Sequence, residues 1–309
     1  MTTPSPLKFK AEMLLLFVAV NWGLTFPFTK ILLQYCSPYA SVFYRFLITF
    51  ALFMLFYRKI FKSINLKDFK YSLVLGILLF LGFITQTVGL TVTSASKSAF
   101  ITGTYLIMLP FAQYIIIKKA PKKENVIGII IVSIGLLFLT QVTHNVEFNF
   151  GDMLTLICAV FFALHIVFLD LFLNTKKADY RVLIFGQFLS MMVYSFFAMI
   201  IFEMIISYDY FIVVNSDLVL TFLFNAIVAT LIGLILVNKF QRYTTPVKAG
   251  IIYSMEQVFA ALSAFIILNE IMKFEQWIGA AIMLIGLAIS EFYGYFRNKS
   301  KYGTREDKS

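Results

Sequence analysis

The chain has 309 residues, of which 60% are hydrophobic and only 14% charged, and its formal net charge is +10. Soluble domains carry roughly 25% charged residues, so this composition excludes an ordinary water-soluble protein. It indicates an integral membrane protein, in which the excess of basic residues needs an explanation of its own.

Ten apolar segments near the bilayer-spanning length of roughly 20 residues follow one another along the chain. They lie at about 11–33, 38–57, 71–90, 93–117, 125–140, 151–172, 182–206, 218–240, 244–268 and 277–296. Lipid offers no partner to open backbone N–H and C=O groups, so each segment is expected to be helical. The predicted fold is therefore an all-α integral membrane protein with ten transmembrane helices.

The basic residues lie almost entirely in alternate connections between these segments. Of the 26 lysines and arginines, the connections on the opposite side hold Lys273 alone. Positive residues stay in the cytoplasm, which predicts a cytoplasmic N-terminus (1–10), a cytoplasmic tail (297–309) and an extracytoplasmic connection at 141–150. The basic excess is thus a signal of topology, and no nucleic-acid partner is expected.

The chain repeats itself at an offset of 151 residues. Residues 124–136 and 275–287 are identical at seven of 13 positions. The same offset pairs two further sets of residues, Lys97 with Lys248 and Tyr105 with Glu256. The identical glycines are Gly128, Gly135, Gly279 and Gly286, and we expect them to pack helices closely, with a homodimer face as one option.

Each copy of the repeat holds five segments, so the second copy enters the membrane upside down. We therefore predict two inverted five-helix repeats, at 11–140 and 151–296. Inverted repeats are typical of secondary transporters, which bind solute near the middle of the membrane and work by alternating access. The chain has no Gly-x-x-x-x-Gly-Lys-Ser/Thr phosphate loop, so a proton gradient or exchange is expected to drive transport.

Four stretches together resemble the EamA-domain branch of the drug/metabolite transporter superfamily. They are Asn21-Trp22-Gly23 leading to Lys30, Phe43-Tyr44-Arg45-Phe46, Thr93–Gly103 leading to Leu109-Pro110, and Ser254-Met255-Glu256-Gln257 followed by Glu270 and Ile278-Gly279-Ala280. The resemblance covers the whole chain. It implies a ten-helix transporter of small organic metabolites such as amino acids, amines, nucleotide-like compounds or vitamins. Where relatives have Glu-Pro in the ninth segment, this chain has Glu256-Gln257, so a less broken helix is expected there.

Glu256 is the first candidate for a solute-binding residue. It falls in the middle of the ninth segment, where a charged carboxylate must be paired, protonated or turned to a wet cavity. It could bind a substrate amine or a proton, or it could form a structural hydrogen bond. Its neighbour Gln257 would add two donors and an acceptor.

Other mid-segment side chains are candidate cavity residues. Tyr105 needs a partner for its hydroxyl if it is buried, and Trp22 lies away from the interfacial belt where membrane tryptophans gather. Thr25 lies on the same helical face as Trp22. Gln86, His165 and Tyr253 complete the set, with hydrogen bonding between helices as the alternative for the two polar ones.

Two lysines and a proline mark the ends and the middle of these helices. Lys97 and Lys248 are predicted at the outer and inner mouths of the cavity, where they reach headgroups or attract an anion. Pro110 lacks a backbone donor and is expected to break the fourth segment. Arg45 is expected to pair with Glu203 or to reach the membrane interface.

The predicted function is a secondary transporter of a small polar organic metabolite in the cytoplasmic cell membrane, working as an exporter. Amino acids or related amines are the first candidates, with Glu256 meeting the ammonium and Lys97 or Lys248 the carboxylate. A vitamin or nucleotide-like aromatic solute is the second candidate. An integral-membrane enzyme acting on lipid-linked substrates is disfavoured, since the only histidines are His144 and His165 and no paired carboxylate motif accompanies them. No cofactor or metal is expected.

Overall fold

The computed structural model describes residues 6–140, 148–207, 209–269 and 271–306. Most of the predicted connection at 141–150, with His144, lies outside these ranges. Glu270, residues 1–5 and the last three residues of the tail lie outside them as well.

The described residues are helical, apart from one isolated β-bridge between Cys36 and Ile212. Eight helical stretches in them are long and apolar enough to cross a membrane, and Phe274–Ser290 is a shorter apolar helix. The prediction of an all-α membrane protein is therefore confirmed at this level. Ten spans in two inverted repeats remain a prediction.

The first four long stretches lie in the N-terminal half of the chain. They are α1 (Pro6–Leu32), α2 (Pro38–Phe56), α3 (Leu66–Val92) and the combined α4 (Ala95–Gly103) and α5 (Tyr105–Ile117). A short 3₁₀ segment, η1 (Arg58–Ser63), connects α2 to α3, and α6 (Lys123–Thr140) ends this half.

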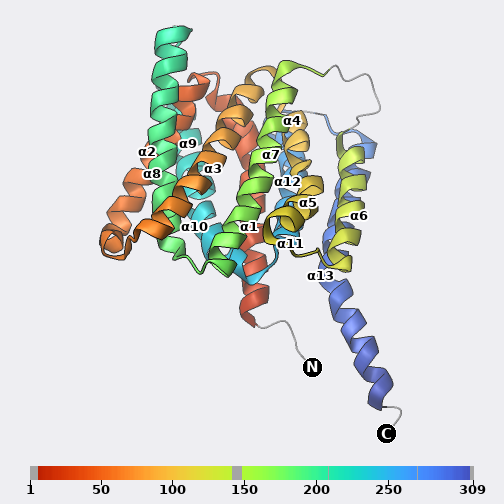
Figure 1. Ribbon diagram of the computed structural model, residues 1–309. Coiled ribbons are helices and arrows are strands. Elements are labelled where there is room, and N and C mark those ends of the chain that lie inside the picture. Colours follow the sequence, from red (N-terminus) through yellow and green to blue (C-terminus); the bar gives the residue numbers. More distant parts are fainter. Residues whose placement is uncertain (1–5, 141–147, 208, 270, 307–309) are drawn as a thin grey trace.

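The other four long stretches lie in the C-terminal half, and three of them contain π-helical turns. They are α7 (Phe150–Asp170) with η2 (Leu171–Thr175); α8 (Tyr180–Ala198) with η3 (Met199–Ile206); α9 (Ser216–Leu223), η4 (Phe224–Ile232), α10 (Gly233–Phe240) and η5 (Gln241–Tyr243); and α11 (Pro246–Tyr253) with α12 (Met255–Ile267). Helix α13 (Phe274–Glu306) runs ten residues past the expected end at 296, so most of the predicted tail is helical. The beginning of α1 and the end of α13 lie at the same end of the bundle (Figure 1).

Helices α6 and α13 form an antiparallel pair at one side of the bundle (Figure 1). A methyl group added to Gly135 would lie 2.8 Å from Met283, and one added to Gly286 would lie 2.7 Å from Val132. The repeated glycines therefore bring two helices of one chain together. These glycines thus serve packing within one chain, and the homodimer remains a prediction.

The fourth and eighth long stretches are each broken near their middle, at Thr104 and Ser254. The Thr104 hydroxyl donates to the Ile101 carbonyl at 2.6 Å, and the Ser254 hydroxyl donates to the Ile251 carbonyl at 2.7 Å. A hydroxyl bonded to a carbonyl three residues back competes with the helical ladder. Pro110 lies inside the continuous helix α5, so its predicted role as the break is wrong, as is the expectation of a less broken helix at Glu256-Gln257.

Glu203 holds the N-terminus of α2. Its carboxylate accepts hydrogen bonds from the Ser37 hydroxyl at 2.7 Å and from the backbone amides of Tyr39 at 2.6 Å and Ala40 at 3.0 Å. A carboxylate is favoured there because the amides at a helix start have no helical partners. The predicted pair between Arg45 and Glu203 is therefore wrong.

Candidate functional site

A cavity lies in the middle of the bundle, next to the two helix breaks. It contains about 580 Å³ of space free of protein atoms, part of which is open to the outside. Eight helices contribute to its wall: α1, α2, α3, α5, α7, α10, α11 and α12. The residues that line it are Trp22, Thr25, Arg45, Leu79, Phe83, Gln86, Tyr105, Phe162, His165, Ile166, Leu234, Tyr253 and Glu256.

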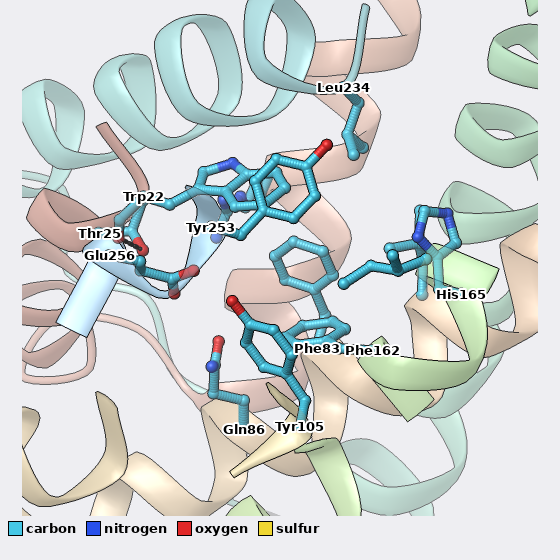
Figure 2. A pocket seen from close by; sticks show the side chains of 13 residues that line it. Trp22, Thr25, Phe83, Gln86, Tyr105, Phe162, His165, Leu234, Tyr253 and Glu256 are labelled. Carbon is cyan, nitrogen blue, oxygen red and sulfur yellow. Dashed lines mark hydrogen bonds between the residues drawn. The ribbon is translucent and has the colours of Figure 1, made fainter. Parts of the chain in front are cut away.

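Seven of the eight predicted cavity residues lie in this wall, as Figure 2 shows: Trp22, Thr25, Gln86, Tyr105, His165, Tyr253 and Glu256. They come from segments far apart in the chain, and the two repeat mates Tyr105 and Glu256 lie in the first turn after each helix break. The structure thus brings the candidates together, and their binding of a solute remains a prediction.

Glu256 is the acidic residue of the cavity wall. Its side chain is buried, with 7% of the residue exposed. Among the described residues no hydrogen bond or ion pair reaches its carboxylate. A carboxylate inside a membrane protein requires a partner or water. The cavity is therefore the place from which that partner has to come.

Two polar side chains gather near Glu256 (Figure 2). The Tyr105 hydroxyl donates to the Gly250 carbonyl at 3.4 Å, which links α5 to α11. The Gln86 amide donates to the Thr102 hydroxyl at 3.0 Å, which links α3 to α4. Both side chains therefore line the cavity and also join helices, so neither of the two predicted roles excludes the other.

Trp22 and Tyr253 form an aromatic part of the cavity wall. Their ring centroids are 5.5 Å apart and the rings are inclined at 50°. The Trp22 indole donates to the Ala229 carbonyl in η4 at 2.9 Å, and the Tyr253 hydroxyl donates to the Gln241 side chain at 3.1 Å. With their polar atoms satisfied outside the cavity, the rings present apolar faces to a solute.

His165 and Thr25 make their hydrogen bonds away from Glu256. An imidazole nitrogen of His165 lies 3.0 Å from the side-chain oxygen of Gln187 in α8, and Gln187 also donates to Asn238 at 2.9 Å. The Thr25 hydroxyl donates to the Trp22 carbonyl at 2.6 Å. His165 is thus part of a network between helices and still lines the cavity on one side.

Gln257 does not line the cavity, contrary to the prediction. Consecutive residues of an α-helix point about 100° apart, so with Glu256 on the cavity face Gln257 turns away. It is 1% exposed and packs against α4, where a methyl group added to Gly103 would lie 2.9 Å from the Gln257 side-chain amide carbon. Its amide atoms have no hydrogen-bond partner in the described part of the chain.

Arg45 is the cavity residue that the sequence analysis placed elsewhere. It is 7% exposed, and its Nε donates to the Thr230 hydroxyl at 2.6 Å. Its guanidinium lies 4.8 Å from the centre of the Phe83 ring. The available signal was the position of an arginine well inside an apolar segment, which marks a functional candidate by default.

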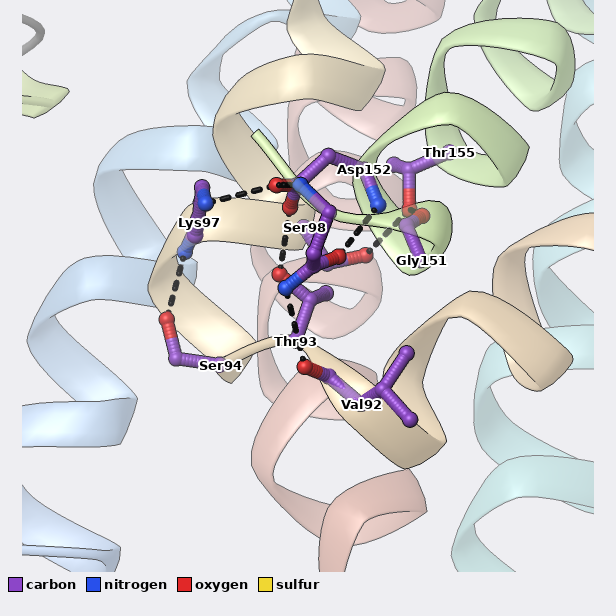
Figure 3. A network of polar contacts seen from close by, with 9 residues as sticks. Val92, Thr93, Ser94, Lys97, Ser98, Gly151, Asp152 and Thr155 are labelled. Carbon is purple, nitrogen blue, oxygen red and sulfur yellow. Dashed lines mark hydrogen bonds and ion pairs between the residues drawn. The ribbon is translucent and has the colours of Figure 1, made fainter. Parts of the chain in front are cut away.

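The two predicted mouth lysines form ion pairs instead of reaching headgroups. The Lys97 ammonium lies 2.6 Å from Asp152 in α7, and the Lys248 ammonium lies 2.6 Å from Glu12 in α1. Figure 3 shows the first pair, in which Asp152 also accepts from the Thr93 hydroxyl at 2.6 Å. Neither lysine lines the cavity, so neither is placed to meet a solute carboxylate there.

The two ion pairs correspond to each other. Lys97 and Lys248 each follow the N-cap of a broken helix, where Ser94 and Thr245 accept from the lysine amide. Each lysine pairs with a carboxylate in the first turns of α7 or α1. The pairs lie at opposite ends of the bundle, one near the start of α4 and the other near the start of α11 (Figure 1).

The sequence profile of the EamA-like transporter family matches residues 9–141 and again residues 149–292. The chain belongs to this family. The family predicted from the sequence is thereby confirmed, and this transporter is a multi-pass membrane protein and no enzyme.

Relatives of this transporter agree with that assignment. An uncharacterized transporter of Archaeoglobus fulgidus is 32% identical over 283 residues, which is 90% of this chain and 85% of the relative. A protein of known crystal structure is 14% identical, with a TM-score of 0.69 over 91% of this chain and 97% of its own. At that identity the second likeness shows the fold alone.

Proposed function

We propose that this transporter moves a small polar organic metabolite across the cytoplasmic membrane by alternating access. In this proposal the chain has ten spans in two inverted repeats, at 11–140 and 151–296, with both termini in the cytoplasm. Three observations support it: the offset of 151 residues, the family profile that matches twice, and the corresponding pairs Lys97–Asp152 and Lys248–Glu12. Inverted repeats give one unit two packings, each open to one side.

In the conformation described, both ion pairs are formed. The Lys97–Asp152 pair closes the outer side of the cavity and the Lys248–Glu12 pair closes the inner side. Opening to either side then requires one pair to separate while the other stays. This assignment follows from the repeat, because an inverted copy carries the same contact to the other side of the membrane.

The buried Glu256 carboxylate carries the proposal for the solute. It has no partner among the described residues and faces the cavity. A carboxylate in that position binds an ammonium group through charge-assisted hydrogen bonds. Amino acids or related amines are therefore the first candidates. Net transport is outward in this proposal, driven by exchange or by a proton gradient.

Reconstitution tests this function directly. Vesicles that contain the purified transporter and a high internal concentration of unlabelled amino acids and amines should take up trace labelled solute faster than protein-free vesicles. The uptake should saturate, and it should need the internal solute, because exchange is a property of a carrier. Uptake that never saturates would indicate a channel and would contradict the proposal.

A vitamin or nucleotide-like aromatic solute is the second candidate. The aromatic faces of Trp22, Tyr105 and Tyr253 favour it, because a flat ring system stacks well on such walls. A panel of vitamins and nucleosides in the same exchange assay distinguishes it from the first candidate.

Labelling of single cysteines tests the topology. Asp209 and Lys62 are both exposed and fall in connections predicted on opposite sides of the membrane. In a background that lacks Cys36 and Cys158, Asp209→Cys should react with an impermeant maleimide on intact cells. Lys62→Cys should react only after the membrane is permeabilised. Protection of position 209 on intact cells would break the inverted arrangement.

A further inference from the structure

Arg45 brings a second, opposite charge into the cavity. It lies within α2, 7% of the residue is exposed, and no carboxylate pairs with it in the described part of the chain. A buried guanidinium without a counter-charge is strongly unfavourable inside a membrane. In the described part of the chain, neither Arg45 nor Glu256 is therefore paired with a side chain of opposite charge.

The contacts of Arg45 leave most of its donors available. A guanidinium has five N–H donors, and here only Nε is used, in its bond to Thr230. The Thr230 hydroxyl donates in turn to the Asn225 carbonyl at 2.6 Å, so it can only accept from Arg45. Together with the Phe83 ring, this bond fixes the side chain, and the two terminal nitrogens remain for a ligand.

Arg45 and Glu256 do not neutralise each other. No ion pair joins them among the described residues, although both line the same cavity. They are also the charged members of that wall, since the Lys97 and Lys248 ammonium groups are paired outside it. An amine would satisfy Glu256 and leave Arg45 without a partner, and an organic acid would do the reverse.

We infer that the cavity recognises a zwitterion, with the solute carboxylate on the Arg45 guanidinium and its ammonium group on Glu256. The arginine fork suits the two oxygens of a carboxylate, and such bidentate contacts are strong and directional. The inference rests on the proposed function and narrows it from amino acids or amines to amino acids. It also moves the anion-binding role from the two lysines to Arg45.

The rest of the wall indicates the side chain of that amino acid. Besides the charged groups, the cavity is lined by Trp22, Phe83, Phe162 and Tyr253, together with aliphatic residues. Apolar walls around a few polar anchors are typical of small-molecule sites. An aromatic or branched aliphatic side chain therefore suits this cavity.

The wild-type transporter tests the inference in two matched series of probes. The benzyl series is phenylalanine, phenethylamine and 3-phenylpropionate, and the isobutyl series is leucine, isoamylamine and 4-methylpentanoate. Each is used as the internal solute in the exchange assay. In at least one series the amino acid should exchange about tenfold or more faster than its amine or its acid, since each anchor is a charge-assisted contact.

The outcomes separate this inference from the proposed function. Amines that exchange as well as the amino acids would overturn the zwitterion and leave the proposed function standing. If neither amino acids nor amines exchange in either series, the inference and the first solute candidate both fail.

Arg45→Gln tests the residue itself. It should reduce the preference for the amino acid over its amine by about tenfold or more, while exchange of the amine persists and shows that the protein is folded. Arg45→Lys keeps the positive charge and loses the planar guanidinium with its paired donors. Its preference for the amino acid should therefore lie between those of the wild type and Arg45→Gln. Arg58→Gln, an exposed arginine, is the matched control. An unchanged preference in Arg45→Gln, or in Arg45→Lys if the former cannot be purified, would overturn the inference.

Discussion

Exchange of amino acids should fall by about 10- to 100-fold when Glu256 is replaced by glutamine. Glutamine has nearly the same size and keeps hydrogen-bonding atoms, so the change removes the charge and little else. A hydrogen bond to a charged group contributes about 1.5–3 kcal/mol, which corresponds to that loss of affinity. Initial rates of labelled uptake into proteoliposomes measure it.

A matched control distinguishes the loss of the Glu256 charge from the loss of any carboxylate. Glu275→Gln removes a carboxylate from an exposed position of α13 and should leave exchange unchanged. The Glu256→Gln protein should insert normally, and its exchange should also lose the pH dependence that a titrating carboxylate gives the wild type. Wild-type rates over the whole pH range would remove Glu256 from the site.

Lys97→Ala and Lys248→Ala should have large and opposite effects on the conformation. Removing Lys97 leaves the fully buried Asp152 side chain without its cation, and breaking a buried pair in this way destabilises the contact by about 3–5 kcal/mol. In the proposed cycle only the closed outer side makes that contact, so the open outer side becomes favoured. Lys248→Ala should favour the open inner side, by a smaller amount, because the Glu12 carboxylate that it leaves behind is more exposed than Asp152 and also lies near Lys8.

Accessibility of a cavity position measures this shift. Ile166→Cys, in a background without Cys36 and Cys158, places a thiol in the wall. An impermeant reagent outside intact cells should label it faster in Lys97→Ala than in the parent and more slowly in Lys248→Ala. The exchanged pair, Lys97→Asp with Asp152→Lys, should restore the parent rate. Equal labelling in both alanine variants would show that the pairs do not control access.

Eight of the ten predicted segments are helical stretches long and apolar enough to cross a membrane, and the sequence could predict them because apolar length alone defines them. The sequence also identified most of the cavity, since Trp22, Tyr105 and Glu256 are polar or aromatic side chains where lipid would favour aliphatic ones. Gln257 shows the limit of that reasoning. Two adjacent polar residues share a segment, and only the rotation of the helix, which neighbouring helices determine, decides that Glu256 faces the cavity.

Contacts between distant segments could not be predicted in the same way. Nothing in the sequence joins Lys248 to Glu12, which lie 236 residues apart. Arg45 was expected to pair with Glu203 or to reach the membrane interface because of its distance from the end of its segment. That distance does not tell which residue of another helix it contacts, and in the structure this is Thr230. The break in the fourth segment was assigned to Pro110, the strongest local signal, and none was expected to stand out at Glu256-Gln257. The structure has its breaks at Thr104 and Ser254, whose hydroxyls compete for helical carbonyls.

Three groups of the first helix of this transporter have partners in the last third of the chain. Glu12, which also lies 3.9 Å from Lys8 in its own helix, pairs with Lys248. The Trp22 indole donates to the Ala229 carbonyl, and a methyl group added to Gly23 would lie 2.6 Å from Phe259 in α12. During synthesis these three contacts of α1 can therefore form only after most of the chain has been made. A chain that ends before α11 would therefore leave the surface of α1 that packs against α11 and α12 uncovered. Such uncovered surface is what cellular quality control detects.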